Sequence, residues 1–234
     1  MQNEKHTDKT DAENKTSSIT AIAVSTALCL VPIIFGSALW QKLPQKIPMN
    51  YGIHGKAGTL APKWVIVFLL PFYCAAINCV ACVLLYKNKK SVNSVLFYAV
   101  TFFVPLLSIL TEALLLIKPL GIDAPVHKII PALMSAFFVL VGNYFPKISK
   151  NNVIGIRVPW TLKSDGVWRK THRLGGILWV VFGFISLAFS FTRIYYVVFF
   201  TSLAVMTIVP VAYSAVVYNK SATKNSDSLN ELHS

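Results

Sequence analysis

The sequence is poor in charged residues, and acidic residues are the scarcest of them. Charged residues make up 13% of the 234 residues and hydrophobic residues 55%, whereas soluble domains carry about 25% charged and about 45–50% apolar residues. This composition excludes an ordinary soluble globular domain, and the high hydrophobicity excludes a disordered chain. The mean hydropathy is +0.59, so the apolar residues must face a solvent other than water, and a lipid bilayer is the obvious one.

The sequence also lacks the residue patterns that enzymes and metal sites need. It contains no H-E-x-x-H, no G-x-S-x-G and no cluster of paired aspartates. A membrane enzyme would have to use His54, His127 or His172, and none of these has an acid or a nucleophile nearby in the sequence. We therefore expect no catalytic residue, no metal ligand and no cofactor.

Six apolar segments are long enough to cross a bilayer, which requires about 20 residues in a helix. They are residues 19–40, 64–86, 95–117, 129–145, 176–192 and 194–218. Backbone polar groups in lipid must be bonded internally, so these segments are predicted to be helices. We predict an all-α membrane protein, a polytopic bundle of about six transmembrane helices. Residues 19–86 hold the first two spans and residues 95–218 the other four, between flexible tails at 1–18 and 219–234.

The first span has the length of a retained helix and not of a cleaved signal peptide, since 22 apolar residues follow a polar tail of 18. All four cysteines, at positions 29, 74, 79 and 82, fall inside predicted spans. We expect them to pack as small apolar side chains and to form no disulfide framework.

Basic residues predict the orientation of the chain. With the N-terminus inside, 15 of the 22 Lys and Arg lie on the cytoplasmic side and 7 outside, so both termini are predicted to be cytoplasmic. Residues 146–175, here called the connector, hold seven of these cations on the cytoplasmic side. Residues 41–63, here called the first loop, lie outside. Cations beside helix ends also contact anionic lipid, so the net charge of +13 requires no nucleic acid.

The connector is the most informative segment of the chain. Pro146 ends the fourth span, Gly155 and Pro159 indicate bends, and Ser164 or Asp165 would cap a short helix over residues 166–173. In that helix Trp168 and His172 share a face, as do Arg169 and Arg173. One interpretation is a helix that lies on the membrane surface and is anchored by Trp. The other is a fixed platform for a protein or peptide.

Glu112 is the one carboxylate inside a predicted span. Such an acid in hydrocarbon is costly and usually faces a polar interior. It is either a proton or cation site or an interfacial acid that pairs with Lys118. The first alternative leads to a second function, a small transporter or channel with Glu112 as the coupling group.

Three sequence blocks in and around the connector resemble the SdpI family of bacterial immunity proteins. They are G-N-Y-F-P-K-I at residues 142–148, G-I-R-V-P-W-T-L at 155–162 and V-W-R-K-T-H-R-L-G-G at 167–176. The first loop resembles a short domain of unknown function that is found at the N-terminus of such proteins. Its matching residues are Leu43, Pro44, Ile47, Pro48, Tyr51, Gly55 and Gly58, whereas Asn50 and Ala57 stand where that pattern has His and Asp.

The resemblance implies a multi-pass cell-membrane protein of mainly Gram-positive bacteria that protects cells from a secreted, sporulation-delaying toxin peptide. It also implies a receptor role, in which the toxin-bound protein holds a cytoplasmic transcriptional repressor at the membrane. The toxin would then meet the first loop, through Leu43, Pro44, Ile47, Pro48, Tyr51 and Gly55. The functional motif of the connector would comprise Asn143, Pro146, Gly155, Arg157, Pro159, Trp160, Trp168, Arg169, His172, Arg173, Gly175 and Gly176. Membrane lipid would be the remaining partner.

Overall fold

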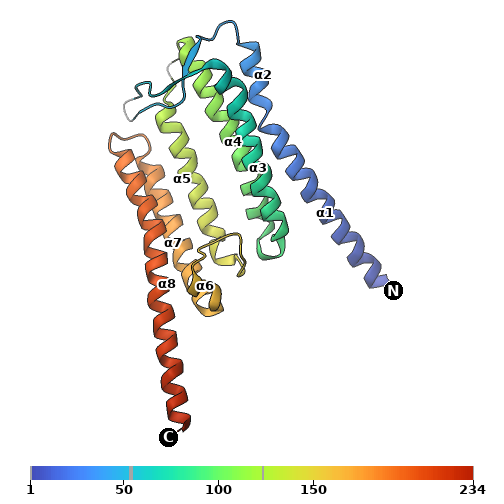
Figure 1. Ribbon diagram of the computed structural model, residues 1–234, viewed down its shortest axis with the longest axis vertical. Coiled ribbons are helices and arrows are strands. Elements are labelled where there is room, and N and C mark those ends of the chain that lie inside the picture. Colours follow the sequence, from blue (N-terminus) through green and yellow to red (C-terminus); the bar gives the residue numbers. More distant parts are fainter. Residues whose placement is uncertain (1, 53–54, 123, 234) are drawn as a thin grey trace. The chain divides into compact units, whose positions relative to one another are not determined.

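The computed structural model describes residues 2–52, 55–122 and 124–233, with side chains at 15–52, 55–122, 124–221 and 223. Eight α-helices follow one another along these residues: α1 (Gln2–Leu28), α2 (Val31–Ala38), α3 (Leu70–Lys87), α4 (Ser94–Ile117), α5 (Val126–Tyr144), α6 (Pro159–Lys163), α7 (Asp165–Phe189) and α8 (Tyr195–His233) (Figure 1). A π-helix, η1 (Val65–Leu69), leads into α3, and three 3₁₀ turns complete the helical elements: η2 (Lys89–Ser91), η3 (Lys118–Leu120) and η4 (Phe145–Lys147). Two short strands, β1 (Lys46–Pro48) and β2 (Leu60–Pro62), form the small sheet described here.

Six helical segments are long and apolar enough to cross a membrane, at Lys15–Ala38, Val65–Lys87, Ser94–Leu120, Val126–Lys147, Asp165–Phe189 and Tyr195–Ser221. Many large apolar side chains on them are exposed in the absence of lipid, such as Phe72, Val80 and Val197. The predicted fold class, an all-α multi-pass membrane protein, is therefore confirmed. His54 lies outside the described residues.

The terminal segments are helical in backbone, because α1 begins at Gln2 and α8 ends at His233. The sequence assigned residues 1–18 and 219–234 to flexible tails, and their flexibility stays a prediction.

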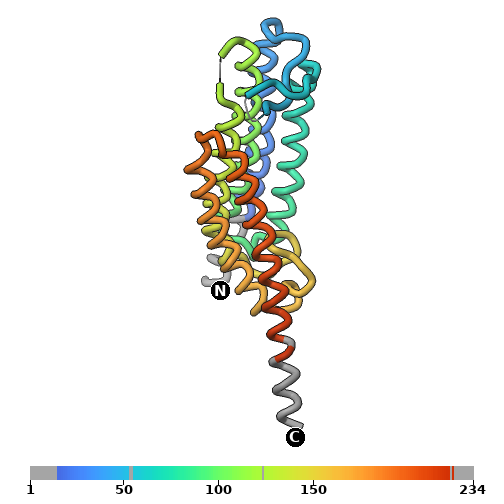
Figure 2. Tube along the Cα trace, turned by 90° about the vertical axis from the view of Figure 1, so that its left-hand side faces the viewer, coloured from blue at the N-terminus to red at the C-terminus, as the bar shows by residue number. Residues whose placement is uncertain are grey.

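The chain forms two compact units. Unit 1 comprises Met1–Lys89 and Ser94–Ile130, and unit 2 comprises Lys90–Asn93 and Pro131–Ser234. In unit 1, helices α1, α3 and α4 pack against one another. In unit 2, α7 and α8 run antiparallel and side by side, connected by a short turn (Figures 1 and 2).

The first span is broken and is not one straight helix. Helix α1 ends at Leu28, and Pro32 lies in the first turn of α2. The Ile33 amide bonds to the Leu30 carbonyl across this break. The Cys29 carbonyl is left to accept a hydrogen bond from the Ser108 hydroxyl of α4 at 3.5 Å.

A β-hairpin closes one end of unit 1, where the sequence had predicted only a loop. Strands β1 and β2 pair antiparallel, with Ile47 opposite Ala61. Both side chains are buried with Leu43 and four residues of η1 and α4, which are Ile66, Val67, Leu115 and Leu116. Burial of this apolar cluster is what holds the hairpin to the helices, since a two-stranded hairpin alone is marginal in water.

Two features of α5, α7 and α8 bring the helices of unit 2 together. A Cβ on Gly176 would lie 2.7 Å from the Gly142 carbonyl oxygen, so the small residue allows α5 and α7 to approach closely. Pro210 of α8 has no N–H, so it cannot bond the carbonyl four residues earlier, that of Met206. The Trp179 indole of α7 donates to this Met206 carbonyl at 3.2 Å.

Candidate functional site

Most of the connector belongs to helical elements. It begins in η4, passes through an extended stretch and α6, and continues directly into α7. The predicted short helix over 166–173 is wrong as a separate element, because α7 runs on to Phe189. The fifth span therefore begins 11 residues before the predicted position 176. Ser164 caps α7 as predicted, its hydroxyl accepting from the Val167 amide at 3.4 Å.

Asn151 shapes the extended stretch. Its side-chain oxygen accepts from the amides of Val153 and Ile154, both at 2.8 Å, and its side-chain amide donates to the Ser149 carbonyl at 2.8 Å. These bonds fold the backbone into a turn that the side chain itself satisfies. Gly155 follows at φ +107°, a conformation that L side chains rarely adopt.

His172 of α7 connects this turn to the helix. The Ile156 amide donates to His172 Nε2 at 3.2 Å, so Nε2 is the unprotonated nitrogen. Nδ1 therefore carries the hydrogen, and it donates to the Trp168 carbonyl at 2.9 Å. The imidazole is fully buried. A Cβ on Gly155 would lie 2.2 Å from Nε2, so only glycine permits this approach.

A stack of rings extends from His172. Its imidazole lies 4.0 Å from the Trp168 ring and 5.1 Å from the Phe145 ring, and Phe145 stacks in turn on Trp179 at 5.3 Å. The Trp168 indole donates to the Ile148 carbonyl at 2.9 Å and its side chain is 2% exposed. The interpretation of Trp168 as an exposed membrane anchor is therefore wrong: it packs inside unit 2 and holds the connector.

Helix α6 fastens the connector to α8. The Thr161 hydroxyl donates to the Ile156 carbonyl at 2.8 Å and accepts from the Val158 amide at 3.1 Å. The Trp160 indole donates to the Ser214 hydroxyl of α8 at 2.7 Å. The connector is thus bonded to both helices of the α7–α8 pair.

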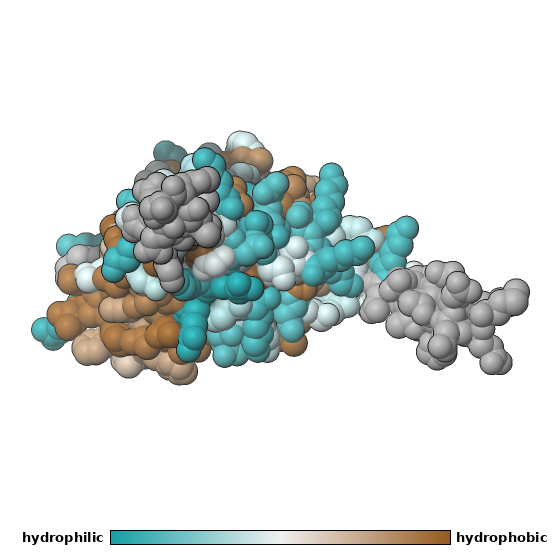
Figure 3. All heavy atoms as spheres, turned by 90° about the horizontal axis from the view of Figure 1, so that it is seen from below, coloured by the Kyte–Doolittle hydropathy of each residue, from teal (hydrophilic) through white to brown (hydrophobic). Residues whose placement is uncertain are grey.

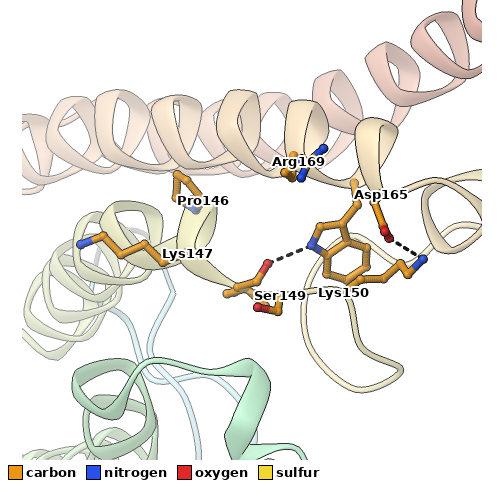
Figure 4. A pocket seen from close by; sticks show the side chains of 8 residues that line it. Pro146, Lys147, Ser149, Lys150, Asp165 and Arg169 are labelled. Carbon is orange, nitrogen blue, oxygen red and sulfur yellow. Dashed lines mark hydrogen bonds and ion pairs between the residues drawn. The ribbon is translucent and has the colours of Figure 1, made fainter.

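The cations of the connector remain on its surface. Exposed side chains include those of Lys147, Lys150, Arg157, Lys163, Arg169, Lys170 and Arg173. Residues 146–150 and α7 line an open cavity of about 470 Å³, with Asp165, Trp168 and Arg169 on the helix side. Lys150 pairs with Asp165 at 2.5 Å, whereas Lys147 extends away from them (Figure 4). The exposed side chains of Lys147, Lys150 and Arg169 give the cavity a basic rim.

Figure 3 shows hydrophobic side chains gathered on one flank of the surface and hydrophilic side chains beside them. This distribution is the one expected of a helix end that meets water beside lipid.

The predicted connector motif is therefore brought together, but its members divide into two groups. Gly155, Trp168, His172, Gly175 and Gly176 are interior residues that fix the connector. The exposed members are Asn143, Pro146, Arg157, Pro159, Arg169 and Arg173, and Trp160 is half-buried. Sequence analysis missed Asn151, Thr161 and Ser214. Asn favours turns because its side chain can bond the backbone two residues on, and this preference could have identified Asn151.

The first-loop residues divide in a similar way. Leu43 and Ile47, which were predicted to contact a toxin, are 4% and 0% exposed and belong to the apolar cluster of unit 1. These two side chains stabilise the hairpin, and a contact between them and a toxin stays a prediction. Pro44 is exposed, and Pro48, Tyr51 and Gly55 are half-buried.

Tyr51 lies beneath a cation in the same region. The Lys118 ammonium lies 4.6 Å from the centre of the Tyr51 ring and donates to the Ala124 carbonyl at 3.4 Å. Burial raises the pKa of the Tyr51 phenol above its ordinary value. This arrangement occupies the lysine that the sequence offered as a partner for Glu112.

Glu112 itself is buried and unpaired. Its side chain is 1% exposed, and among the described residues neither carboxylate oxygen has a hydrogen-bond partner. The alternative of an interfacial acid that pairs with Lys118 is therefore wrong.

The comparisons with known proteins fall on these two regions. Residues 147–214 match the SdpI/YfhL protein family, and residues 27–74 match a domain of unknown function, DUF1648. The predicted resemblance is thus confirmed: a model of the SdpI/YfhL family matches the C-terminal part of the chain, and a DUF1648 model matches the N-terminal part. It is also similar to the immunity protein SdpI of Bacillus subtilis strain 168, with 29% identity over 168 residues, which cover 72% of this chain and 80% of the relative. No solved structure matches.

Proposed function

We propose that this chain is a bacterial immunity protein of the cell membrane, which protects the cell from a secreted antimicrobial peptide. The observation that carries the proposal is the similarity to the immunity protein SdpI, which extends over most of both chains. It is supported by the fold, because the matched residues 147–214 include the connector from Lys147 onward and the two helices to which it is bonded. A peptide that lyses or depolarises a membrane must first insert into it. The protein would protect the cell by binding this peptide and so preventing its insertion.

The first loop is the proposed contact for the peptide. The basic residues of the chain favour a topology with cytoplasmic termini, which leaves this loop outside. Its hairpin exposes two large apolar side chains, Met49 at 46% and Leu60 at 55%, and Trp64, directly after the loop, is 53% exposed. Exposed apolar side chains rimmed by lysines suit an amphipathic peptide, whose apolar face they would bury.

Survival of a sensitive host tests this proposal. Cells that produce the protein should grow at a concentration of purified toxin peptide that stops cells carrying an empty vector. Replacing Leu60 with Asp should abolish protection at an unchanged level of protein in the membrane, because a charge then faces the apolar peptide. Replacing the exposed Lys163 of the connector with Glu is the matched control and should leave protection unchanged. No protection by the wild-type protein against any toxin of the producing strain would refute the proposal.

We further propose that the connector is the signalling surface, which captures a cytoplasmic repressor when toxin is bound. The exposed arginines Arg157, Arg169 and Arg173 suit an acidic partner surface, with which guanidinium groups form bidentate bonds. Changing Arg157 and Arg169 to Glu should release a fluorescent repressor from the membrane while protection persists. Capture that survives both reversals would contradict this assignment.

A further inference from the structure

Unit 1 contains a column of buried polar side chains that belongs neither to the connector nor to the first loop. Helices α1, α3 and α4 contribute them, and each is at most 6% exposed: Ser18, Ser25, Asn78, Thr101, Ser108 and Glu112. On α4 the three members are spaced by seven and four residues, so they lie on one face of the helix. Burying polar side chains inside a membrane-spanning bundle costs free energy. Such side chains therefore usually mark an ion pathway or a binding site.

The column begins at the end of unit 1 where Lys89 lies. The Lys89 ammonium donates to the Ser18 hydroxyl. Further along, the Asn78 amide donates to the Ser25 hydroxyl at 3.0 Å, and the Cys82 thiol donates to the Asn78 oxygen at 3.6 Å. Hydroxyl, amide and thiol groups therefore follow one another from this end into the helix bundle.

Thr101 continues the column along α4. Pro105 is four residues later and has no N–H, so the Thr101 carbonyl receives no helical hydrogen bond from it. The Thr101 hydroxyl is also buried and lies beside the Cys82 thiol of α3. Two hydrogen-bonding groups are thus available at one level of the helix, about 16 Å from Glu112 at 1.5 Å per residue.

Glu112 is the last member of the column. One turn before it, the Ser108 hydroxyl donates to the Cys29 carbonyl that the break in the first span exposes. The Cys74 thiol of α3 lies beside Ser108 and within electrostatic reach of Glu112. Both carboxylate oxygens of Glu112 lack partners among the described side chains.

No described cation from the surrounding elements of unit 1 neutralises this acid. The Cys29 thiol follows α1, the Cys74 thiol lies on α3, and α2 has no titratable residue. Lys46 of β1 is exposed, Lys118 of η3 lies over Tyr51, and His127 of α5 lies against Gly55. A hard metal ion would need about six oxygen ligands, whereas thiols and single hydroxyls are offered here. A proton is the remaining cation that a lone buried carboxylate can bind.

We propose that Glu112 is an intramembrane proton-binding site, which exchanges its proton with the aqueous phase along the polar column through Thr101. A proton delivered by water at the Lys89 end forms an O–H bond on one carboxylate oxygen, and the neutral carboxyl is the resting form. The site is independent of the immunity function proposed above.

Infrared spectroscopy of the full-length protein in lipid nanodiscs tests this proposal. At neutral pH the wild-type protein should show the C=O stretch of a protonated carboxyl, which disappears in Glu112→Gln. In Glu112→Asp the band should shift but persist, and this variant keeps the test informative if Glu112→Gln does not fold. Asp165→Asn is the matched control, because the Asp165 side chain is 70% exposed, and it should leave the band unchanged.

Exchange into heavy water tests the route. Thr101→Val has the same shape and removes only the hydroxyl beside the Cys82 thiol, so it should slow deuteration of the carboxyl band several-fold. A band that is absent at neutral pH, that survives Glu112→Gln, or that responds to replacing sodium with choline would overturn the proton site. Unchanged exchange in Thr101→Val would overturn the route.

Discussion

At the scale of single residues, the connector depends on an interlock between one glycine and one histidine. Gly155 supplies the backbone conformation at φ +107°, and His172 Nε2 occupies the space in which a side chain would lie. The same nitrogen accepts the amide of the next residue, Ile156. The turn and the helix therefore fix each other, and neither residue can change alone.

Replacing Gly155 with Ala should destabilise unit 2 strongly. The positive φ costs about 1–2 kcal/mol for an L residue, and the new Cβ would lie 2.2 Å from His172 Nε2. Thermal unfolding in detergent should show a lower midpoint than wild type. Gly166→Ala in the first turn of α7 is the control, because its Cβ meets nothing closer than 3.7 Å, and its midpoint should be unchanged or higher. Equal midpoints for the two variants would contradict the interlock.

The imidazole of His172 should be neutral, with its hydrogen on Nδ1. Nitrogen-15 chemical shifts of the ring distinguish the two tautomers and the charged form. The same tautomer is predicted for the protein in nanodiscs and in detergent, because both hydrogen bonds lie within unit 2. A shift typical of an imidazolium at neutral pH would mean that the Ile156 amide has no acceptor there.

At the scale of elements, proline and glycine decide how the helices meet. Pro210 frees the Met206 carbonyl for Trp179, and the break before Pro32 frees the Cys29 carbonyl for Ser108. Each backbone defect is used by a side chain of a neighbouring helix. Such defects are tolerated in membrane helices when neighbours satisfy the exposed groups.

The bond between α6 and α8 should be measurable by a double-mutant cycle. Trp160→Phe and Ser214→Ala each remove the 2.7 Å hydrogen bond, and the coupling between them should be about 0.5–1.5 kcal/mol in unfolding free energy. Thr207→Ala is a suitable control on the same helix, since that hydroxyl donates to the Leu203 carbonyl of its own helix. It should show no coupling to Trp160→Phe.

Hydropathy was sufficient to predict the six spans, because the length of an apolar run is set by the thickness of the bilayer. It could not predict where α7 starts. Residues 165–175 are polar enough to read as a loop, yet they continue the helix because Trp168 stacks on His172, which in turn stacks on Phe145. The hairpin was missed for a related reason. Its stability comes from packing Leu43 and Ile47 on Leu115 and Leu116, which are distant in sequence.

At the scale of the whole molecule, the position of the connector relative to the membrane is the central prediction. After four spans it must lie on the side where the chain starts, and after one span the first loop must lie on the other. Basic residues predict that the starting side is the cytoplasm.

Cysteine labelling of intact cells should establish this topology. In a variant whose four cysteines are replaced, Lys163→Cys should react with a membrane-impermeant maleimide only after permeabilisation. Thr59→Cys in the first loop should react in intact cells, since this residue is exposed. Labelling of residue 163 from outside would reverse the orientation and exchange the proposed toxin and repressor surfaces.

Helix α7 runs without a break from Asp165 to Phe189, a rod about 37 Å long at 1.5 Å per residue. Arg169 and Arg173 are exposed near the N-terminal end of this helix, which is the fifth span. A protein that binds these arginines would therefore be attached to a helix whose other end lies across the bilayer. A small translation or rotation of that end would be transmitted to the opposite leaflet, because the helix has no break that could absorb the motion.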